Sequence, residues 1–219
     1  MIRVLVVDDH DLVRTGIRRL LEDRRDSDGI EVVGEADSGE AAVEAVRSLS
    51  PDVLLMDVNM PGIGGLEAIR RILLHESAPR IIVVTVHSEG PFPRRLLEAG
   101  AVGYLTKDCH IDEMIQAIRT VHRGGKHISS EIAQQLALSM LPGGNESPFE
   151  RLSQREMQIL LMITQGHRPQ VISDKLCLSP KTVSTYKSRL HDKLNVKSDV
   201  EMIRLAIQHG LIEKEFFLG

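Results

Sequence analysis

Residues 2–9 read IRVLVVDD, a run rich in Val, Ile and Leu that ends in two adjacent carboxylates. The apolar run predicts a strand at residues 2–7 that is buried on both faces, because it lacks the alternation of a half-buried strand. Segments of helical spacing separate it from similar apolar runs at residues 31–36, 53–56, 81–84 and 103–105. This alternation predicts an α/β fold: a flavodoxin-like, doubly wound (βα)5 domain around a parallel sheet.

The C-terminal third of the chain carries only helical signals. Ser153 and Glu156 form a capping box at the start of an apolar helix. A second short helix is expected from Pro169, which suits a first helical turn. After a three-residue turn, a helix rich in Lys and Arg follows at residues 181–194, and a fourth is expected at 198–208. Two short helices joined by such a turn indicate a helix-turn-helix.

This change of pattern predicts a chain of two domains with different partners. We expect an α/β domain at residues 1–123, a partly helical linker at 124–148 and a small all-α domain at 149–219. Residues 1–147 carry 16 Lys and Arg against 23 Asp and Glu, whereas residues 148–219 carry 11 against 8. The basic second part, densest in residues 173–197, indicates a nucleic-acid partner, although a solvated helix face is the alternative.

Composition excludes several classes of protein. No apolar run approaches the ~20 residues that span a bilayer, so we expect no membrane association. The 2 Cys form neither a disulfide framework nor a zinc site, which favours a reducing compartment and a cytoplasmic location. With 0 Trp, 2 Tyr and 4 Phe, the chain lacks the aromatic platforms of proteins that read single-stranded nucleic acid.

Polar residues follow four of the predicted strands at their carboxyl ends, where open parallel sheets bind ligands. They are Asp8, Asp9, Asp57, Thr85 and Lys107. Converging carboxylates bind hard divalent cations such as Mg²⁺. Asp57 would be the nucleophile that accepts a phosphoryl group. The cation and Lys107 would neutralise the phosphoryl oxygens, and Thr85 would donate a hydrogen bond to one of them.

Each of these residues alone has an ordinary explanation. An Asp at a strand end is most often a turn former or a helix cap, and Asp9 could cap the first helix. Five such residues, in order at the ends of the strands, are hard to obtain by chance. The pattern as a whole therefore favours one site over five separate turns.

The segments around these residues are recognisable as a set. They read VVDDH at 6–10, LMDVNMPG at 55–62, VT at 84–85 and GYLTK at 103–107. They resemble the receiver domain of two-component response regulators. The segments LSQRE at 152–156, LSPKTV at 178–183 and KL at 193–194 resemble the LuxR/NarL-type helix-turn-helix. Residues 57–68, 147–149 and 172–183 resemble the GacA/UvrY/SirA group of this NarL/FixJ family.

The resemblance implies roles for the residues of the first domain. Asp8 and Asp9 would be the acidic metal pair, and the backbone carbonyl of Asn59 would complete a Mg²⁺ site with Asp57. Asp57 would be the phosphoacceptor, and a sensor histidine kinase would be the partner that supplies the phosphoryl group.

The resemblance also implies a switch pair, Thr85 and Tyr104. Thr85 would move to the phosphoryl oxygen and Tyr104 would rotate inward behind it, so that the signalling face changes shape. From its sequence position alone, Tyr104 could equally be a half-buried aromatic residue on an edge strand.

The helix at 181–194 carries the DNA-binding prediction. Its apolar positions form a stripe that should face the core: Val183, Tyr186, Leu190 and Leu194. On the other side, Ser184, Thr185 and Ser188 lie where NarL-type proteins reach base edges. Lys181, Lys187 and Arg189 are placed for phosphates.

These observations predict a phosphorylation-controlled transcription factor that binds double-stranded promoter DNA as a dimer. Resemblance to the group implies promoters of small regulatory RNAs as targets. A dinucleotide-binding enzyme is disfavoured because residues 62–67 lack the third glycine of GxGxxG. The alternative is a receiver that acts only through protein contacts, as an adaptor without salt-dependent DNA affinity.

Overall fold

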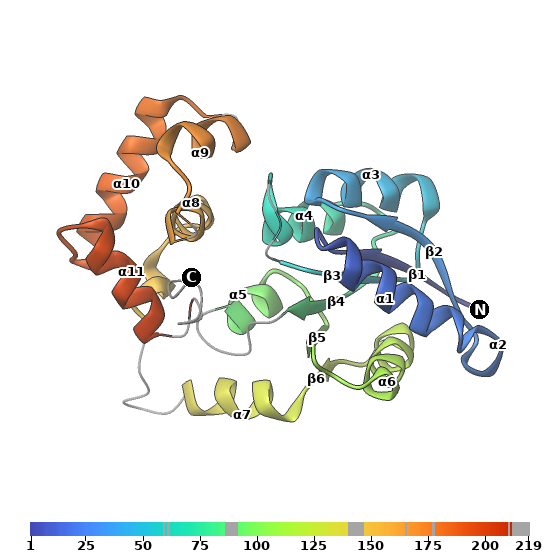
Figure 1. Ribbon diagram of the computed structural model, residues 1–219. Helices are drawn as coiled ribbons and strands as arrows, with labels where there is room; N and C mark the ends of the chain where they lie inside the picture. Colours follow the sequence, from blue (N-terminus) through green and yellow to red (C-terminus); the bar gives the residue numbers. More distant parts are fainter. Residues whose placement is uncertain are drawn as a thin grey trace. The chain divides into compact units, whose positions relative to one another are not determined.

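The computed structural model describes residues 1–58, 60, 62–85, 92–139, 147–164, 166–176, 178–209 and 211. The chain divides into two compact units at about residue 134. Figure 1 shows an α/β unit in blue to green and a helical unit in orange to red. No helix in the described ranges is long and apolar enough to cross a membrane.

The first unit alternates strands and helices as the sequence predicted. Its elements are β1 (Ile2–Val7), α1 (Asp11–Glu22), α2 (Arg25–Asp28), β2 (Ile30–Ala36), α3 (Gly39–Leu49), β3 (Val53–Met56), α4 (Gly64–Leu73), β4 (Arg80–Thr85), α5 (Phe92–Glu98), β5 (Gly103–Thr106), α6 (Ile111–His122) and β6 (His127–Ile128). The six strands form one parallel sheet in the order β2-β1-β3-β4-β5-β6. The strand order reverses between β1 and β3, which opens a crevice at their carboxyl ends.

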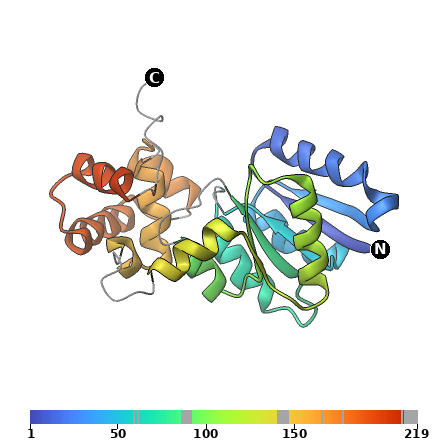
Figure 2. The same cartoon turned by 90° about the horizontal axis from the view of Figure 1, so that it is seen from below.

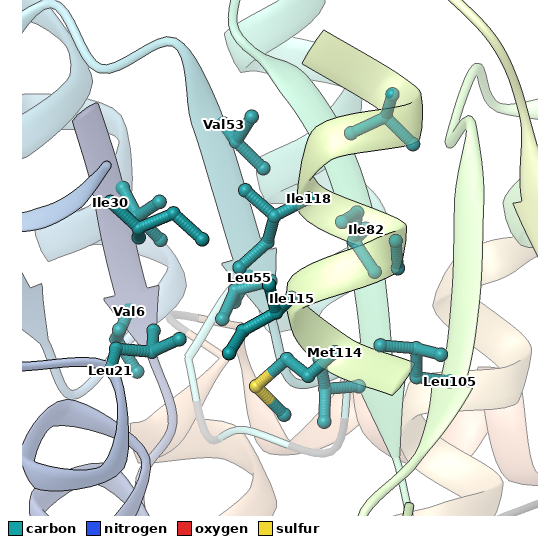
Figure 3. Packing of buried hydrophobic residues seen from close by; sticks show 14 residues of the cluster. Val6, Leu21, Ile30, Val53, Leu55, Ile82, Leu105, Met114, Ile115 and Ile118 are labelled. Carbon is teal, nitrogen blue, oxygen red and sulfur yellow. The ribbon is translucent and has the colours of Figure 1, made fainter. Parts of the chain in front are cut away.

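The core of this unit lies on both faces of the sheet, as expected for strands that are apolar throughout. Figure 3 shows Met114, Ile115 and Ile118 of α6 packed over Leu55 and Ile82 of the central strands. Helices α1 and α6 contact each other on this face (Figure 2). On the opposite face α3 and α4 pack together. The double layer holds the strands rigidly and so fixes the position of the residues at their carboxyl ends.

Two short elements of the first unit were not predicted. The segment 124–148, expected to be a partly helical linker, contributes β6, which pairs Gly103 with His127 and Tyr104 with Ile128. As a result β5 is not an edge strand. Helix α2 has only four residues, and its N-cap residue Arg24 makes no side-chain cap. Elements of two and four residues are too short to show periodicity, which is why the sequence pattern did not reveal them.

The second unit is helical. After α7 (Ser130–Ser139), which spans the boundary, it contains the 3-10 helix η1 (Pro148–Arg151), α8 (Gln154–Thr164), α9 (Pro169–Lys175), α10 (Pro180–Leu194) and α11 (Asp199–Gln208). Ser179 caps α10, because its Oγ accepts the Thr182 N–H at 3.0 Å. Phe149, Leu160, Leu190 and Met202 are fully buried and bring η1, α8, α10 and α11 together. The helices α9 and α10 form the predicted helix-turn-helix.

Candidate metal centre and nucleic-acid interface

Two carboxylates are brought together by neighbouring parallel strands. Asp8 follows β1 and Asp57 follows β3, and both side chains are only 2% exposed. The Asp57 N–H donates to the Val7 carbonyl at 2.8 Å, which continues the β1–β3 ladder beyond the last paired residues. The strand register therefore forces the two acidic side chains into the same crevice.

A four-residue cluster surrounds this point. One ligand atom from each of Asp8, Asp9, His10 and Asp57 lies within 4.8 Å of the others. His10 is the N-cap residue of α1 but makes no side-chain cap, and its Nδ1 lies 3.3 Å from Asp8 Oδ1 and 3.0 Å from Asp9 Oδ1. The ordinary explanation for Asp9, that it caps the first helix, is therefore wrong.

The electrostatics of Asp9 suit a cation. Burial raises the pKa of the Asp9 carboxyl, His10 partly offsets this, and the neighbouring Asp57 and Asp8 raise it further. Its buried Oδ1 accepts no hydrogen bond from any described residue. A divalent cation would supply a partner for this oxygen and a compensating positive charge, so this set of oxygen donors fits Mg²⁺.

Lys107 supplies the positive charge that the site contains. Its Nζ lies 2.6 Å from Asp8 Oδ2 and 2.8 Å from Asp57 Oδ2. Burial lowers the pKa of Lys107, but the charges and hydrogen bonds of Asp57 and Asp8 outweigh burial and leave the pKa raised. The Lys107 N–H donates to the Thr85 carbonyl at 2.9 Å, which places the side chain at the end of the sheet. The ammonium is therefore charged and already directed at Asp57.

The two residues predicted to form a switch pair are fully buried. Thr85 ends β4 and Tyr104 lies in β5. Burial and the Asp57 charge raise the pKa of the Tyr104 phenol, so it stays protonated under ordinary conditions. The expectation of a half-buried residue on an edge strand is wrong, because β6 covers the outer edge of β5. The Tyr104 side chain is 0% exposed in this structure.

The loop after Asp57 is shaped by a close backbone approach that sequence reasoning missed. Gly65 donates its N–H to the Val58 carbonyl at 3.2 Å, and a Cβ atom at Gly65 would lie 2.6 Å from the Asp57 carbonyl oxygen. Only glycine permits this contact between α4 and the loop. Its only sequence signal is the pair Gly64-Gly65. Asn59, predicted to complete the metal site through its carbonyl, lies outside the described residues.

In the second unit, a buried carboxylate holds α8 and α10 together. The Ser153 N–H donates to Glu156 Oε2 at 2.6 Å and the Glu156 N–H to Ser153 Oγ at 3.3 Å, which confirms the capping box. Lys193 of α10 reaches the same Glu156 Oε2 at 2.7 Å. Burial raises the Glu156 pKa, but the bonds from Lys193 and Ser153 outweigh burial and lower it.

This pair gives the helical unit an acid-sensitive contribution to stability. Because folding lowers the pKa of Glu156, the pair stabilises the unit above the ordinary pKa of 4.5 and is lost as the pH falls through the lowered value. We expect wild-type stability to fall more steeply than that of Glu156→Gln below about pH 4.5 in urea unfolding monitored by circular dichroism. Equal slopes for the two proteins would contradict this role.

One face of α10 does not pack against the core of the helical unit. Val183, Leu190 and Leu194 are buried and Tyr186 is half-buried, as the apolar stripe predicted. The exposed positions are Lys181, Ser184, Thr185, Ser188, Arg189 and Asp192. The hydroxyls of Ser184 and Thr185 donate to helix carbonyls four residues earlier, each at 3.0 Å, and both side chains are exposed to solvent.

Lys187 differs in exposure and in ion pairing from the other residues that were predicted to contact phosphates. It is half-buried and its Nζ lies 2.6 Å from Asp199 Oδ2, at the start of α11. His191 shares the same carboxylate, with Nε2 3.0 Å from Asp199 Oδ1. Arg189 is exposed and its guanidinium carbon lies 5.8 Å from the centre of the Tyr186 ring. Arg189 is thus accessible to a phosphate, while Lys187 is engaged by a carboxylate of its own chain.

The chain is similar to known proteins over nearly its whole length. Residues 4–119 match the family described as response regulator receiver domain, and residues 150–206 match bacterial regulatory proteins of the luxR family. It is 58% identical over 214 residues to the response regulator GacA of Pseudomonas viridiflava, covering 97% of this chain and 99% of that one. It is 54% identical over 216 residues to the response regulator UvrY of Escherichia coli K12, covering 98% of each chain.

A solved structure shows the same likeness. RcsB from Salmonella enterica serovar Typhimurium, bound to promoter rprA in the presence of the phosphomimetic BeF3-, is 26% identical with a TM-score of 0.69. The similarity covers 94% of this chain and 98% of that one.

Proposed function

Since the chain belongs to the two-component response regulators with a receiver domain and a LuxR-type DNA-binding domain, we propose that phosphoryl transfer to Asp57 controls its binding to promoter DNA. It is a response regulator and not an enzyme. The observation that carries the proposal is the juxtaposition of buried Asp57 with the Lys107 ammonium, 2.8 Å away, beside an acidic cluster. We propose a receiver domain at residues 1–123, to which β6 adds an edge strand, and a DNA-binding domain at residues 149–219, with the segment 124–148 connecting them.

Mg²⁺ is the cofactor proposed for the receiver. Asp8, Asp9 and Asp57 would hold it through their carboxylates, with the backbone carbonyl of Asn59. The raised pKa of Asp9 supports this assignment, as does its Oδ1, which accepts no hydrogen bond from any described residue and has only the exposed His10 ring nearby. When bound, the cation neutralises negative charge on the phosphoryl oxygens.

The phosphoryl group would come from a phosphohistidine of a sensor histidine kinase. A carboxylate oxygen of Asp57 attacks phosphorus, the new P–O bond forms, and the P–N bond to the kinase imidazole breaks. Lys107, held by Asp8 and Asp57, is placed to pair with the phosphoryl oxygens as they arrive. Thr85 and Tyr104 would respond to the added charge and carry the signal to the output surface.

Lys107 is expected to couple phosphorylation to output. In Lys107→Ala, Asp57 keeps its nucleophile, so the protein should still gain a phosphoryl group in Mg²⁺. Without the ammonium, the phosphoryl oxygens lose the partner at the end of β5 that would draw the loop into its signalling arrangement. We therefore expect the phosphorylated variant to bind DNA no more tightly than the unphosphorylated one. Lys126→Ala, an exposed Lys beyond α6, is the control. If phosphorylation increased the DNA affinity of Lys107→Ala as much as that of the wild type, Lys107 would not have this coupling role.

The exposed face of α10 is the proposed reader of double-stranded DNA. Ser184, Thr185 and Ser188 would face base edges in the major groove, and Lys181 and Arg189 would contact phosphates. Lys187 would join them only on leaving Asp199. Paired half-sites would be read by a homodimer. We propose a cytoplasmic location and, as the resemblance to the GacA/UvrY/SirA group implies, promoters of small regulatory RNAs as targets.

Measuring DNA affinity at increasing salt concentration should distinguish residues that contact phosphates from residues that contact bases. Arg189→Ala should weaken binding to specific and random duplexes alike and flatten the salt slope by about 0.9 for each phosphate that the helix no longer neutralises. Thr185→Ala should leave the salt slope unchanged. It should reduce the difference in binding free energy between specific and random duplexes by about 1 kcal/mol. Because Lys187 is paired with Asp199, Lys187→Ala should change the slope less than Arg189→Ala.

The control for these variants is Lys197→Ala, an exposed basic residue just beyond α10. It should leave both the slope and the specificity unchanged. If Thr185→Ala alters the salt slope while Arg189→Ala alters only the specificity, the opposite face of the helix reads the DNA.

A further inference from the structure

Arg14 links the first turns of α1 to the acidic cluster. Its side chain is 15% exposed, and Nη1 donates to the backbone carbonyl of Asp8 at 2.7 Å. Nη2 donates to Asp11 Oδ1 at 2.6 Å, and Nε lies 3.8 Å from Glu35 Oε1 on β2. One planar guanidinium thus connects the end of β1, the start of α1 and the neighbouring strand.

The bond to the Asp8 carbonyl fixes a particular peptide plane. That carbonyl belongs to the peptide that joins Asp8 to Asp9, the two residues predicted to bind the cation. Apart from its own backbone and the nearby ring of His10, which is 65% exposed, no described residue is seen to hold the Asp9 carboxylate, and none of them donates a hydrogen bond to its buried Oδ1. The orientation of this peptide therefore decides whether the Asp9 carboxylate converges with those of Asp8 and Asp57.

We propose that Arg14 is a positioning residue that holds the Asp8–Asp9 peptide in the orientation that binds Mg²⁺. The inference rests on the proposed function, because it assumes the cation site. Arg14 acts through geometry and not through its charge, since Asp11 and Glu35 lie against the guanidinium and balance it. If Arg14 acted only through its charge, its removal would have the opposite effect on Mg²⁺ affinity, because removing a nearby positive charge would strengthen cation binding.

The same helix supplies a matched control. Arg18 lies one turn after Arg14, and its Nε is 3.6 Å from Oε2 of the same Glu35. Its other ion pair is with Glu22 at 3.9 Å, and within the described residues it contacts neither Asp8 nor Asp9. Arg14→Met and Arg18→Met therefore both remove a cation and a Glu35 contact, but only Arg14→Met frees the Asp8 carbonyl.

The test is the dissociation constant for Mg²⁺ of the full-length chain, measured by isothermal titration calorimetry without a phosphodonor. Arg14→Met should raise the constant about tenfold, the size of effect seen when a group that supports a metal ligand is removed. Arg18→Met should stay within about twofold of wild type. Arg14→Lys should be intermediate, because an ammonium can reach Asp8 or Asp11 but lacks the fork that holds both.

Thermal unfolding without Mg²⁺ separates positioning from stability. The two Met variants should unfold at similar temperatures while their Mg²⁺ affinities differ. If Arg14→Met is not folded, Arg14→Lys decides: a raised dissociation constant supports the proposal and a wild-type constant overturns it. Unchanged or tighter binding by Arg14→Met, or equal weakening by Arg18→Met, would also overturn it. Absence of saturable Mg²⁺ binding by the wild type would instead refute the metal site of the proposed function, and the inference with it.

Discussion

Asp57→Asn is expected to abolish phosphorylation of the chain. The substitution keeps the shape of a side chain that is 2% exposed but replaces the carboxylate nucleophile by an amide. Incubated with Mg²⁺ and a phosphorylated kinase or a small acyl phosphate, the wild type should gain the mass of one phosphoryl group, as intact-protein mass spectrometry would show. The variant should gain none.

The control is Asp52→Asn, at the opposite end of the same strand. Asp52 Oδ2 accepts the Arg3 N–H at 2.8 Å, and an Asn oxygen can do the same, so the fold is preserved. Asp52→Asn should be phosphorylated like the wild type. A phosphoryl mass on Asp57→Asn, labile to hydroxylamine as an acyl phosphate is, would show that another carboxylate is the acceptor.

Phe149→Ala is expected to unfold the DNA-binding unit. Phe149 is 0% exposed, and its ring meets that of His209 edge-on at 5.8 Å, so it joins η1 to the end of α11. Removing a buried Phe costs about 3–5 kcal/mol, which is most of the net stability of a domain of this size, about 3–10 kcal/mol. We expect more than a tenfold loss of DNA affinity at 37 °C, measured by fluorescence anisotropy.

Two comparisons identify the cause of that loss. Phe149→Leu keeps most of the buried volume and should retain DNA binding. Phosphorylation of Asp57 in Phe149→Ala should be unaffected, because Asp57 and Phe149 belong to different compact units. Wild-type DNA affinity in Phe149→Ala would contradict the claim that this ring holds the unit together.

The position of the acidic cluster could be predicted from the sequence because parallel strands impose it. Once the runs ending at Asp8 and Asp57 were identified as strands of one sheet, their carboxyl ends had to lie at one edge. The structure brings Lys107 to the same point, within 2.8 Å of both carboxylates. Spacing alone was sufficient here, since each residue directly follows an apolar strand.

Contacts between helices were not predictable in the same way. Lys187 was expected on the DNA side of α10, but it pairs with Asp199, twelve residues later, across the turn into α11. The contact depends on how two helices cross, which periodicity does not specify. Arg14 is a similar case: no motif in the sequence singles it out, and only the fold brings it to the Asp8 carbonyl.

A phosphoryl group on Asp57 is expected to increase the affinity of the chain for DNA, which fluorescence anisotropy measures with a duplex selected from a random pool. Wild type and Asp57→Asn are each titrated with and without an acyl phosphate donor in Mg²⁺. We predict that the donor tightens wild-type binding about 5- to 150-fold, the range of typical coupling between two sites, and leaves Asp57→Asn unchanged. Equal wild-type affinity with and without the donor, at confirmed stoichiometric phosphorylation, would contradict the account, as would an equal gain by Asp57→Asn.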